Sequence, residues 1–400
     1  MVCEDRKQGW GQTGLTGRST TNAVGRERST EGGVFGWLKA IDPILLLTSV
    51  ALTAFGILAV YMAGATAEEA YGLAFNQGLG FVAGLIGAVP LAIYDYRKLQ
   101  KYLPWIYGLA VLLLLAVTIT GDSAMGAQRW IDIGPVRVQP SEFAKLLVVI
   151  ALAGYFAEHP PSETKTFLKS LGFLSVPAAL VFAQPDLGTA LVFGAVFFTV
   201  AFIGGAKVYH LGLLAASGVV AFALAVKFKF LEEYQIARLT AFMDPTGSTD
   251  VGYQVLQSKD AIGSGGLTGK GLEATTLAKL GFLPEDHTDF IFSSLAERIG
   301  FVGGALLLVL FFVLIWRILH VATISKDRFG VLIAVGVATI FLFHVFVNVG
   351  MTMGMMPVTG IPLPFISYGR SSLVVSVISL GLLQGIAMRS KADGYKGVAP

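Results

Sequence analysis

The sequence predicts an all-α integral membrane protein with about ten transmembrane helices, and three observations lead to that prediction. Of the 400 residues, 54% are hydrophobic and only 14% are charged, whereas a soluble domain carries about 25% charged residues. The apolar residues fall in runs of 17 to 27 residues with few or no charges, and ~20 apolar residues cross a hydrocarbon core ~30 Å thick. Lipid offers no partner to backbone N–H and C=O groups, so these runs must be helical.

Ten runs qualify as spans: 44–64, 74–94, 103–120, 141–157, 168–184, 187–204, 208–228, 290–316, 329–350 and 371–388. We expect a disordered cytoplasmic N-terminal tail over 1–40, a ten-helix membrane domain over 41–390 and a C-terminal cytoplasmic tail over 391–400. The longest connection, 227–289, forms a large extracytoplasmic loop between the seventh and eighth spans. No internal repeat is evident, which disfavours a transporter built from two related halves.

The N-terminal segment is polar. Residues 1–35 are rich in Gly, Ser, Thr and Arg and contain no apolar stretch, so we predict disorder and no secretory signal peptide. A contact of this tail with a lipid surface or with a partner stays an alternative. The lone cysteine, Cys3, excludes a disulfide framework. The net charge of +3 is small, and we expect no nucleic-acid partner.

The basic residues orient the spans. An even number of spans places both termini on one side, and that side holds 18 of the 29 Lys and Arg residues. The other side holds nine, six of them in the long 227–289 loop, which counts weakly in the positive-inside rule. Both termini are therefore predicted to be cytoplasmic. The segments that combine Gly, Pro, Trp, Arg, Asp and His then face outward, so chemistry is expected at the outer face.

A carboxylate and an ammonium lie at the outer end of the fourth span. Pro140 and Ser141 indicate a helix start with Ser141 as the N-cap. Glu142 and Lys145 are three residues apart and share a helix face. Charges at this depth are costly unless they are paired or face water. Two interpretations stay open, a buried ion pair that orients two helices or a direct contact with substrate.

Two outer turns hold further candidates. Arg129 and Trp130 suit the depth of lipid headgroups, where Trp is enriched and Arg grips phosphate bidentately. An ordinary interfacial anchor is the alternative. Asp186 lies in a tight turn between the fifth and sixth spans, where it either caps the following helix or binds substrate.

A glycine-rich stretch, 262–271, resembles a phosphate-binding loop. It fails the Walker pattern, because Ser264 stands where Gly is required and Gly271 where Ser or Thr is required. Its amides and Lys270 can still hold a pyrophosphate. Ser264, Gly265 and Lys270 are therefore substrate-binding candidates.

The densest polar cluster lies where the chain enters the eighth span. It contains Glu285, Asp286, His287, Thr288 and Asp289. Partial desolvation at this boundary would raise the pKa of a carboxyl and make it a better base. Three acids and a histidine also permit a divalent-cation site, with Mg or Mn the expected ion. The purely structural alternative is that the side chain of Thr288 or Asp289 caps the helix of the eighth span.

Two further segments are unusual for a membrane protein, a pair of adjacent charges in the eighth span and an irregular apolar stretch before the tenth. Glu297 and Arg298 are adjacent in the eighth span, so they point about 100° apart and each needs its own partner. Residues 356–369 are punctuated by Pro and Gly but are too apolar for a free loop, so we predict a re-entrant or interfacial segment packed against protein. Ser367 and Tyr368 in this segment are substrate-binding candidates.

Eight stretches occur in an order that resembles the SEDS family of RodA, FtsW and SpoVE. They are GAQRWIDIG, QPSEFAKL, QPDLGTA, RLTAFMDP, GYQVLQS, AIGSGGLTGKG, FLPEDHTDFIF and MPVTGIPLPFISYG, and they cover most of residues 44–390. GAQRW, QSKDAIGSGG and the form of MMPVTGIPLPFISYG are most similar to the RodA branch, which acts in cell elongation.

The resemblance implies a function and a set of partners. It implies an inverting glycosyltransferase that polymerises lipid II, the disaccharide on undecaprenyl pyrophosphate, with a class B penicillin-binding protein as transpeptidase. Elongasome proteins and membrane lipids are further expected partners. The family's essential acid carries over to Asp289 and its ion pair to Glu142 and Lys145, while His287 joins the substrate-binding candidates. Arg298 and Arg370 depart from the Glu and Gly usual in the family.

Two rival functions predict different sequence patterns. A lipid II flippase needs polar residues on both membrane faces and a passage through the bundle, whereas here the polar motifs concentrate on one face. A non-catalytic scaffold has little use for intramembrane charges such as Glu142, Lys145 and Asp289. The outward polar motifs therefore favour the glycosyltransferase.

Overall fold

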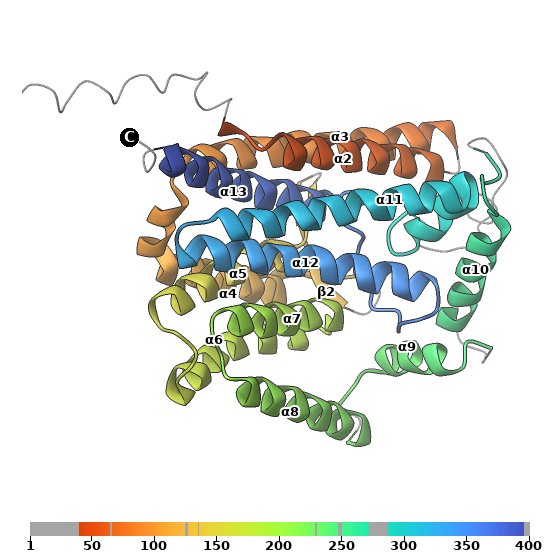
Figure 1. Cartoon of the computed structure of the whole chain (residues 1–400). Coiled ribbons are helices and arrows are strands. Elements are labelled where there is room, and N and C mark those ends of the chain that lie inside the picture. The colour runs from red at the N-terminus through yellow and green to blue at the C-terminus, as the bar shows by residue number, and fades with distance from the viewer. Residues whose placement is uncertain are drawn as a thin grey trace, which may run out of the picture. The chain divides into compact units, whose positions relative to one another are not determined.

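The structure is a computed structural model that describes residues 40–64, 66–124, 127–134, 136–228, 230–246, 250–271 and 287–395. The chain forms two units, Met1–Ala40 and Ile41–Pro400, and the second unit holds the helical bundle (Figure 1). Its helices are α2 (Pro43–Ala63), α3 (Ala67–Ile93), η1 (Tyr96–Tyr102, a 3-10 helix), α4 (Leu103–Thr120), α5 (Pro140–Glu158), α6 (Thr164–Ala183), α7 (Leu187–Ile203), α8 (Val208–Lys227), α9 (Glu233–Met243), α10 (Asp250–Ser264), α11 (Ile291–Ile324), α12 (Arg328–Thr352) and α13 (Arg370–Tyr395).

Each of the ten predicted spans coincides with one of these helices, and the all-α polytopic fold class is confirmed. Among the described residues, nine helices are long and apolar enough to cross a membrane. The tenth, α7, has 17 residues and is therefore about 26 Å long. Three boundaries differ clearly from prediction. The span predicted to start at 74 begins at Ala67, the span predicted to end at 316 continues to Ile324, and the span predicted to end at 388 continues to Tyr395.

The predicted connections carry more structure than the sequence indicated. The long loop 227–289 contains α9 and α10. Helix α9 starts with a capping box, in which the Glu232 N–H donates to the Gln235 side chain at 3.0 Å. The segment before α5 contains a small antiparallel sheet in the order β1 (Asp122–Ala124), β2 (Ala127–Ile133) and β3 (Val136–Val138). In its register, Ile131 lies opposite Val138.

The centre of the bundle is formed by α5, α12 and α13, which are the most buried helices. Helix α12 packs against α5, α7 and α11, and α13 packs along α3. Helix α8 is the least buried, and only His210 and Leu211 in it are buried. Apolar side chains exposed around α8 suit a lipid environment, where an apolar surface costs nothing.

Helix α11 is broken at Gly300, and the glycine-rich stretch packs on the break. Gly300 has φ 67° and ψ −168°, a conformation that strongly favours glycine. The Lys270 N–H donates to Glu297 O at 3.0 Å, and the Phe301 N–H donates to Gly266 O at 2.9 Å. A kink frees backbone groups that need partners, and the glycine-rich stretch supplies them.

The stretch between α12 and α13 packs against protein, as predicted. Val358, Ile361, Leu363, Phe365 and Ile366 in it are buried. Its main chain also approaches α2 so closely that a side chain on Gly56 would collide with the Phe365 carbonyl. Buried irregular backbone needs hydrogen-bond partners, and the side chains that provide them form part of the candidate site.

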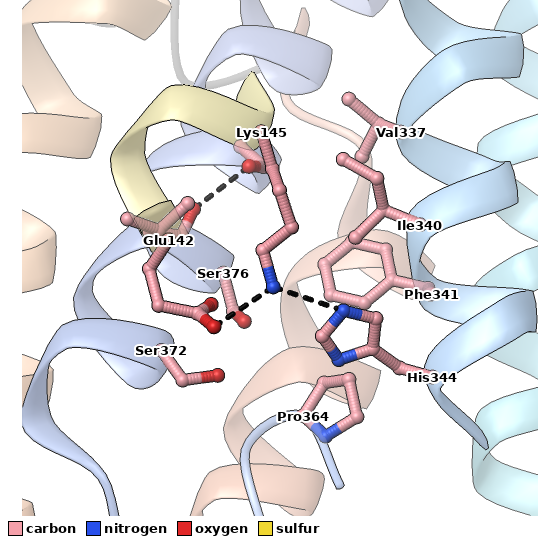
Figure 2. A pocket seen from close by; sticks show the side chains of 11 residues that line it. Glu142, Lys145, Val337, Ile340, Phe341, His344, Pro364, Ser372 and Ser376 are labelled. Carbon is pink, nitrogen blue, oxygen red and sulfur yellow. Dashed lines mark hydrogen bonds and ion pairs between the residues drawn. The ribbon is translucent and has the colours of Figure 1, made fainter. Parts of the chain in front are cut away.

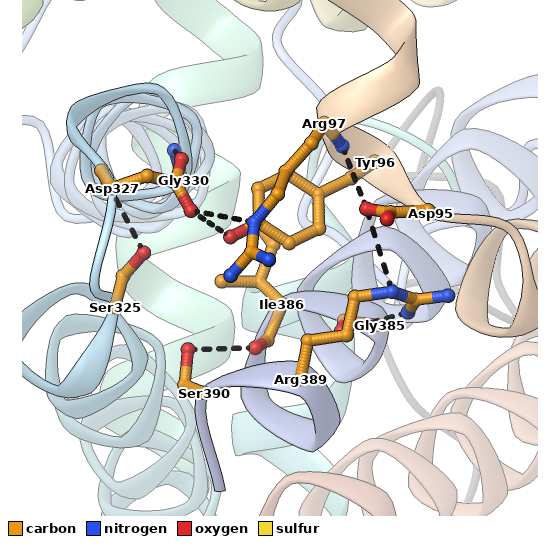
Figure 3. A network of polar contacts seen from close by, with 10 residues as sticks. All are labelled: Asp95, Tyr96, Arg97, Ser325, Asp327, Gly330, Gly385, Ile386, Arg389 and Ser390. Carbon is orange, nitrogen blue, oxygen red and sulfur yellow. Dashed lines mark hydrogen bonds and ion pairs between the residues drawn. The ribbon is translucent and has the colours of Figure 1, made fainter. Parts of the chain in front are cut away.

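A polar network closes the end of the bundle where α11 finishes (Figure 3). The Asp327 carboxylate accepts hydrogen bonds from the Tyr96 hydroxyl and from Arg97 Nε at 3.3 Å. Asp327 also caps α12 by accepting from the Gly330 N–H at 2.8 Å. Arg389 Nε in α13 lies 3.5 Å from Asp95 Oδ1. The network thus ties η1 to α12 and α13.

We predict an acid-sensitive contact at this same end. Asp42 caps α2 and accepts from Arg317 Nε at 2.8 Å. Burial acts to raise the pKa of the Asp42 carboxyl, but hydrogen bonds from Arg317 and Leu45 outweigh it and hold that pKa below its usual 3.8. A lowered folded-state pKa gives stability that is present above about pH 4 and is lost as the pH falls through the folded pKa.

Thermal unfolding in detergent between pH 3 and pH 6 tests this contact. Asp42→Asn should cost about 1.5–3 kcal/mol at pH 6, the range for a hydrogen bond to a charged group. The gap between variant and wild type should shrink below pH 4. A gap that stays constant across this range would contradict the assignment.

Candidate active site

Asp289 lies in the turn that leads into α11, at the opposite end of that helix from Asp327. Its side chain is half-buried. The N-cap position of α11 is Phe290, whose side chain makes no capping hydrogen bond. Thr288 and Asp289 precede that position, and the alternative that one of them caps the helix stays a prediction. Gly360, with φ 73°, faces Asp289 so closely that a Cβ there would lie 3.4 Å from Asp289 Oδ2.

Arg238 approaches the same point from α9. A Cβ on Gly360 would lie 3.3 Å from Arg238 Nη1, so the guanidinium and the Asp289 carboxylate border one position. The guanidinium carbon lies 5.5 Å from the centre of the Tyr234 ring, within the range of a cation–π contact. Arg238 begins the RLTAFMDP stretch, but no local pattern gave it a role, because nothing in the sequence showed that α9 folds back onto the turn before α11.

Arg129 and Asp186 come together beside Tyr234, from elements far apart in sequence. Arg129 in β2 donates to the Pro185 carbonyl and, at 3.2 Å, to the Tyr234 hydroxyl. Its Nη1 lies 4.0 Å from Asp186 Oδ1. Asp186 also caps α7 by accepting from the Thr189 N–H at 3.2 Å, which confirms the capping interpretation. Tyr234 is therefore contacted by two arginines.

Glu142 and Lys145 form a buried ion pair with a third member, His344 (Figure 2). Lys145 Nζ lies 2.8 Å from Glu142 Oε1 and 3.0 Å from His344 Nε2. The other ring nitrogen of His344 lies 3.1 Å from the carbonyl of Pro362. The group lines a cavity of about 20 Å³, room for one water molecule. The ion pair thus links α5 to α12, the arrangement of the helix-orienting interpretation.

Helix α5 begins differently from the prediction, which placed its N-cap at Ser141. The N-cap is Gln139 and Pro140 occupies the first turn. Ser141, predicted as the N-cap, lies inside the helix and is buried. Pro140 fits the first turn because its missing N–H would have no partner there.

The glycine-rich candidates contact α11. Lys270 Nζ lies 2.6 Å from Glu297 Oε1, which gives Glu297 the partner it needed. The Ser264 hydroxyl donates to Ala261 O within α10. The amides of Gly265, Lys270 and Gly271 all donate to protein carbonyls. The structure therefore gives this stretch packing contacts with α11, and the pyrophosphate contact predicted for it stays a prediction.

The remaining candidates surround the 287–289 turn or lie in the sheet. The ring centres of His287 and Tyr368 are 5.7 Å apart. The Ser367 hydroxyl donates to the Thr288 carbonyl at 2.7 Å, so it is engaged with the main chain. Trp130, next to Arg129 in β2, is half-buried.

The metal prediction falls partly outside the described residues. Glu285 and Asp286 lie there, and of the three proposed acidic ligands only Asp289 lies within them. In the part of the chain that the structure describes, no three His, Cys, Asp or Glu side chains are grouped to hold an ion. A divalent cation, Mg or Mn, stays a prediction for this site.

Breaking the buried ion pair should destabilise the protein. Lys145→Met leaves the Glu142 carboxylate buried beside His344, and removal of one partner of a buried pair costs about 3–5 kcal/mol. The double variant Glu142→Gln with Lys145→Met removes both charges and should recover much of the loss. Thermal unfolding of both variants in detergent measures the difference, and equal loss in the single and double variants would contradict a structural role for the pair.

Comparison with known protein families gives one model that spans most of the chain. The FTSW_RODA_SPOVE model, described as cell cycle protein, matches residues 43–392. The chain is 39% identical over 355 residues to peptidoglycan glycosyltransferase MrdB of Escherichia coli K12, a match that covers 88% of this chain and 94% of that protein. It is 34% identical over 367 residues to stage V sporulation protein E of Bacillus subtilis, covering 88% and 98%.

Two solved structures resemble the fold. The rod shape determining protein RodA of Thermus thermophilus is 31% identical with a TM-score of 0.67, and the match covers 88% of this chain and 98% of that one. A chain from a study of polymerization and crosslinking by a peptidoglycan synthase complex is 30% identical with a TM-score of 0.75, covering 88% and 98%.

Proposed function

The chain belongs to the FTSW_RODA_SPOVE family of cell cycle proteins, and from that premise we propose that it is a peptidoglycan glycosyltransferase that polymerises lipid II into glycan strands. Relatives at 39% and 37% identity carry the name peptidoglycan glycosyltransferase, the second as a probable one. The membrane-embedded helices suit a substrate held by a polyprenyl tail.

One observation carries the mechanism. The Asp289 carboxylate and the Arg238 guanidinium border the same position beside Gly360, so a base and a cation converge on one point. A glycosyl transfer from a lipid pyrophosphate needs both groups. The base removes the proton of the acceptor hydroxyl, and the cation stabilises the charge of the departing pyrophosphate.

The reaction is a single displacement. The acceptor sugar oxygen forms a bond to the anomeric carbon of the donor, and the bond from that carbon to the pyrophosphate oxygen breaks. The acceptor proton passes to the Asp289 carboxylate, and the pyrophosphate leaves with the bonding electron pair. One displacement inverts the anomeric carbon, so an α-linked donor yields a β-linked glycan.

Arg129 supplies a second positive charge near the site. It contacts Tyr234 on α9, the helix that also carries Arg238. Arginine binds phosphate oxygens bidentately, so two arginines around Tyr234 suit a diphosphate. We assign pyrophosphate binding to Arg238 first and to Arg129 second, and Lys145 and Lys270 act through their ion pairs with the protein.

The proposed orientation places this site on the outer face of the cytoplasmic membrane with both termini inside. The distribution of Lys and Arg supports it, because 18 of 29 lie on the side of the termini. A class B penicillin-binding protein is the proposed transpeptidase partner, in line with the similarity to a peptidoglycan synthase complex. The similarity to MrdB favours a role in cell elongation.

Polymerisation of purified lipid II tests the proposal. The purified chain is incubated with lipid II and a class B penicillin-binding protein whose transpeptidase serine is blocked, and glycan length is read by gel electrophoresis. We expect polymer. No polymer together with passage of lipid II across liposome membranes would instead support a flippase, and neither activity would support a scaffold.

A further inference from the structure

The main chain of the turn that carries Asp289 is held at three successive carbonyls. The His287 carbonyl accepts from the Tyr368 N–H at 2.8 Å. The Thr288 carbonyl accepts from the Ser367 hydroxyl at 2.7 Å. The Asp289 carbonyl accepts from the Asn348 side-chain amide at 3.0 Å. These donors come from α12 and from the buried stretch that follows it, so a distant part of the chain fixes the path of this turn.

Asn348 joins both sides of the proposed site. Its side chain is fully buried, and its one NH₂ group donates to Asp289 O at 3.0 Å and to Ile361 O at 2.8 Å. The opposite amide orientation would set the Asn348 oxygen against two carbonyl oxygens, so the hydrogen bonds define the orientation. Ile361 follows Gly360, the residue that faces the Asp289 carboxylate. One amide group therefore sets the separation between the Asp289 turn and the Gly360 turn.

Ser367 holds the next carbonyl and is itself fixed. Its hydroxyl donates to Thr288 O and accepts from the Leu363 N–H at 2.8 Å. The Ser367 carbonyl accepts from the Gln77 side chain of α3 at 3.1 Å. Both Ser367 and Gln77 are buried. The Asp289 turn is thus connected through Ser367 to a second helix of the bundle.

We propose that Asn348 and Ser367 are positioning residues for the transfer reaction. They hold the Asp289 carboxylate at the position that it shares with Arg238, through the main chain of 287–289. This inference rests on the proposed function for its effect on turnover, but the structural clamp itself is independent of it. It also gives Ser367 a role different from the substrate contact that the sequence indicated.

The expected kinetic effect depends on where these side chains point. The Ser367 hydroxyl and the Asn348 side-chain amide both donate to backbone carbonyls of the protein. Loss of either group should therefore leave the binding of lipid II largely intact. A base displaced by about 1 Å costs on the order of 10²-fold in rate. Loss of the clamp should therefore lower kcat and leave KM within about twofold of wild type.

Four variants test the clamp in the full-length protein with its transpeptidase partner. Asn348→Leu and Ser367→Ala each remove the donor, Ser367→Thr keeps the hydroxyl, and Thr339→Val is the control. Thr339 lies on α12 like Asn348, but its hydroxyl donates within its own helix. We expect kcat to fall about 10–100-fold in the first two, and Ser367→Thr and Thr339→Val to stay near wild type. A raised KM at unchanged kcat, or no effect, would overturn the proposal.

Hydrogen exchange separates the clamp from the activity. The Tyr368 amide, which donates to the His287 carbonyl at 2.8 Å, should exchange about 5–10-fold faster in Asn348→Leu and Ser367→Ala, the factor for one net hydrogen bond, and not in Thr339→Val. Unchanged exchange in the two variants would refute the clamp even if kcat fell. Faster exchange in a chain whose wild type makes no polymer would leave the clamp in place and count against the proposed function alone.

Discussion

Asp289→Asn should abolish glycan polymerisation while the protein still folds. The asparagine keeps the shape of the half-buried side chain but cannot take the proton of the acceptor hydroxyl. General-base catalysis contributes about 10²–10⁴-fold, so the rate should fall by at least about 100-fold. The measurement is initial polymerisation of lipid II, with thermal unfolding as the check that the variant is folded.

The chain supplies a matched control for this variant. Asp132 in β2 is an exposed aspartate that pairs with Arg137 in the same sheet, at 3.1 Å. Asp132→Asn removes the same charge without touching the proposed site and should polymerise like wild type. Equal polymer from Asp289→Asn and Asp132→Asn would remove Asp289 as the catalytic base. Loss of activity in both would indicate a general effect of the lost charge.

Arg238→Ala should cause the second-largest loss. Removal of a group that stabilises developing negative charge costs about 10²–10³-fold in turnover, and Arg238 is the cation that borders the same position as Asp289. Arg238→Lys keeps the charge but loses the bidentate geometry, so it should recover only part of the rate. Steady-state kinetics with purified lipid II measures both variants, and Arg137→Ala is the exposed-arginine control.

Other results would reassign the role of Arg238. If Arg238→Ala raises KM for lipid II and leaves kcat unchanged, Arg238 binds substrate and transition state equally. If neither constant changes, the pyrophosphate is held elsewhere, and Arg129 is the next candidate because it contacts Tyr234 from a separate part of the chain.

The positions of the membrane-spanning helices were predictable from local composition. A run of apolar residues such as 329–350 has to form a helix in lipid whatever its neighbours are, and α12 spans Arg328–Thr352. Capping at Asp186 was equally local, because a short polar side chain in a tight turn reaches the next amides. The small sheet before α5 was missed, since strands this short give little periodicity.

The partners of the charged residues were predictable in part. Glu142 and Lys145 are three residues apart on one helix, so their pairing was visible in the sequence. His344, the third member, is 199 residues away from Lys145, and no local pattern indicates such a contact. The ion pair between Lys270 and Glu297 was not predictable for the same reason. The two residues are 27 positions apart, and they meet where the glycine-rich stretch packs on the break of α11 at Gly300.

The sequence by itself determined the membrane-embedded all-α fold and the family motifs, because composition and short motifs act over a few residues. It also pointed to Asp289, whose role as the base stays a prediction. Only the tertiary structure decided what surrounds Asp289. Arg238, Gly360, Asn348 and Ser367 reach it from separate parts of the chain. Their convergence depends on how α9, α12 and the stretch before α13 pack on the start of α11, and packing between distant segments leaves no periodic signal in the sequence.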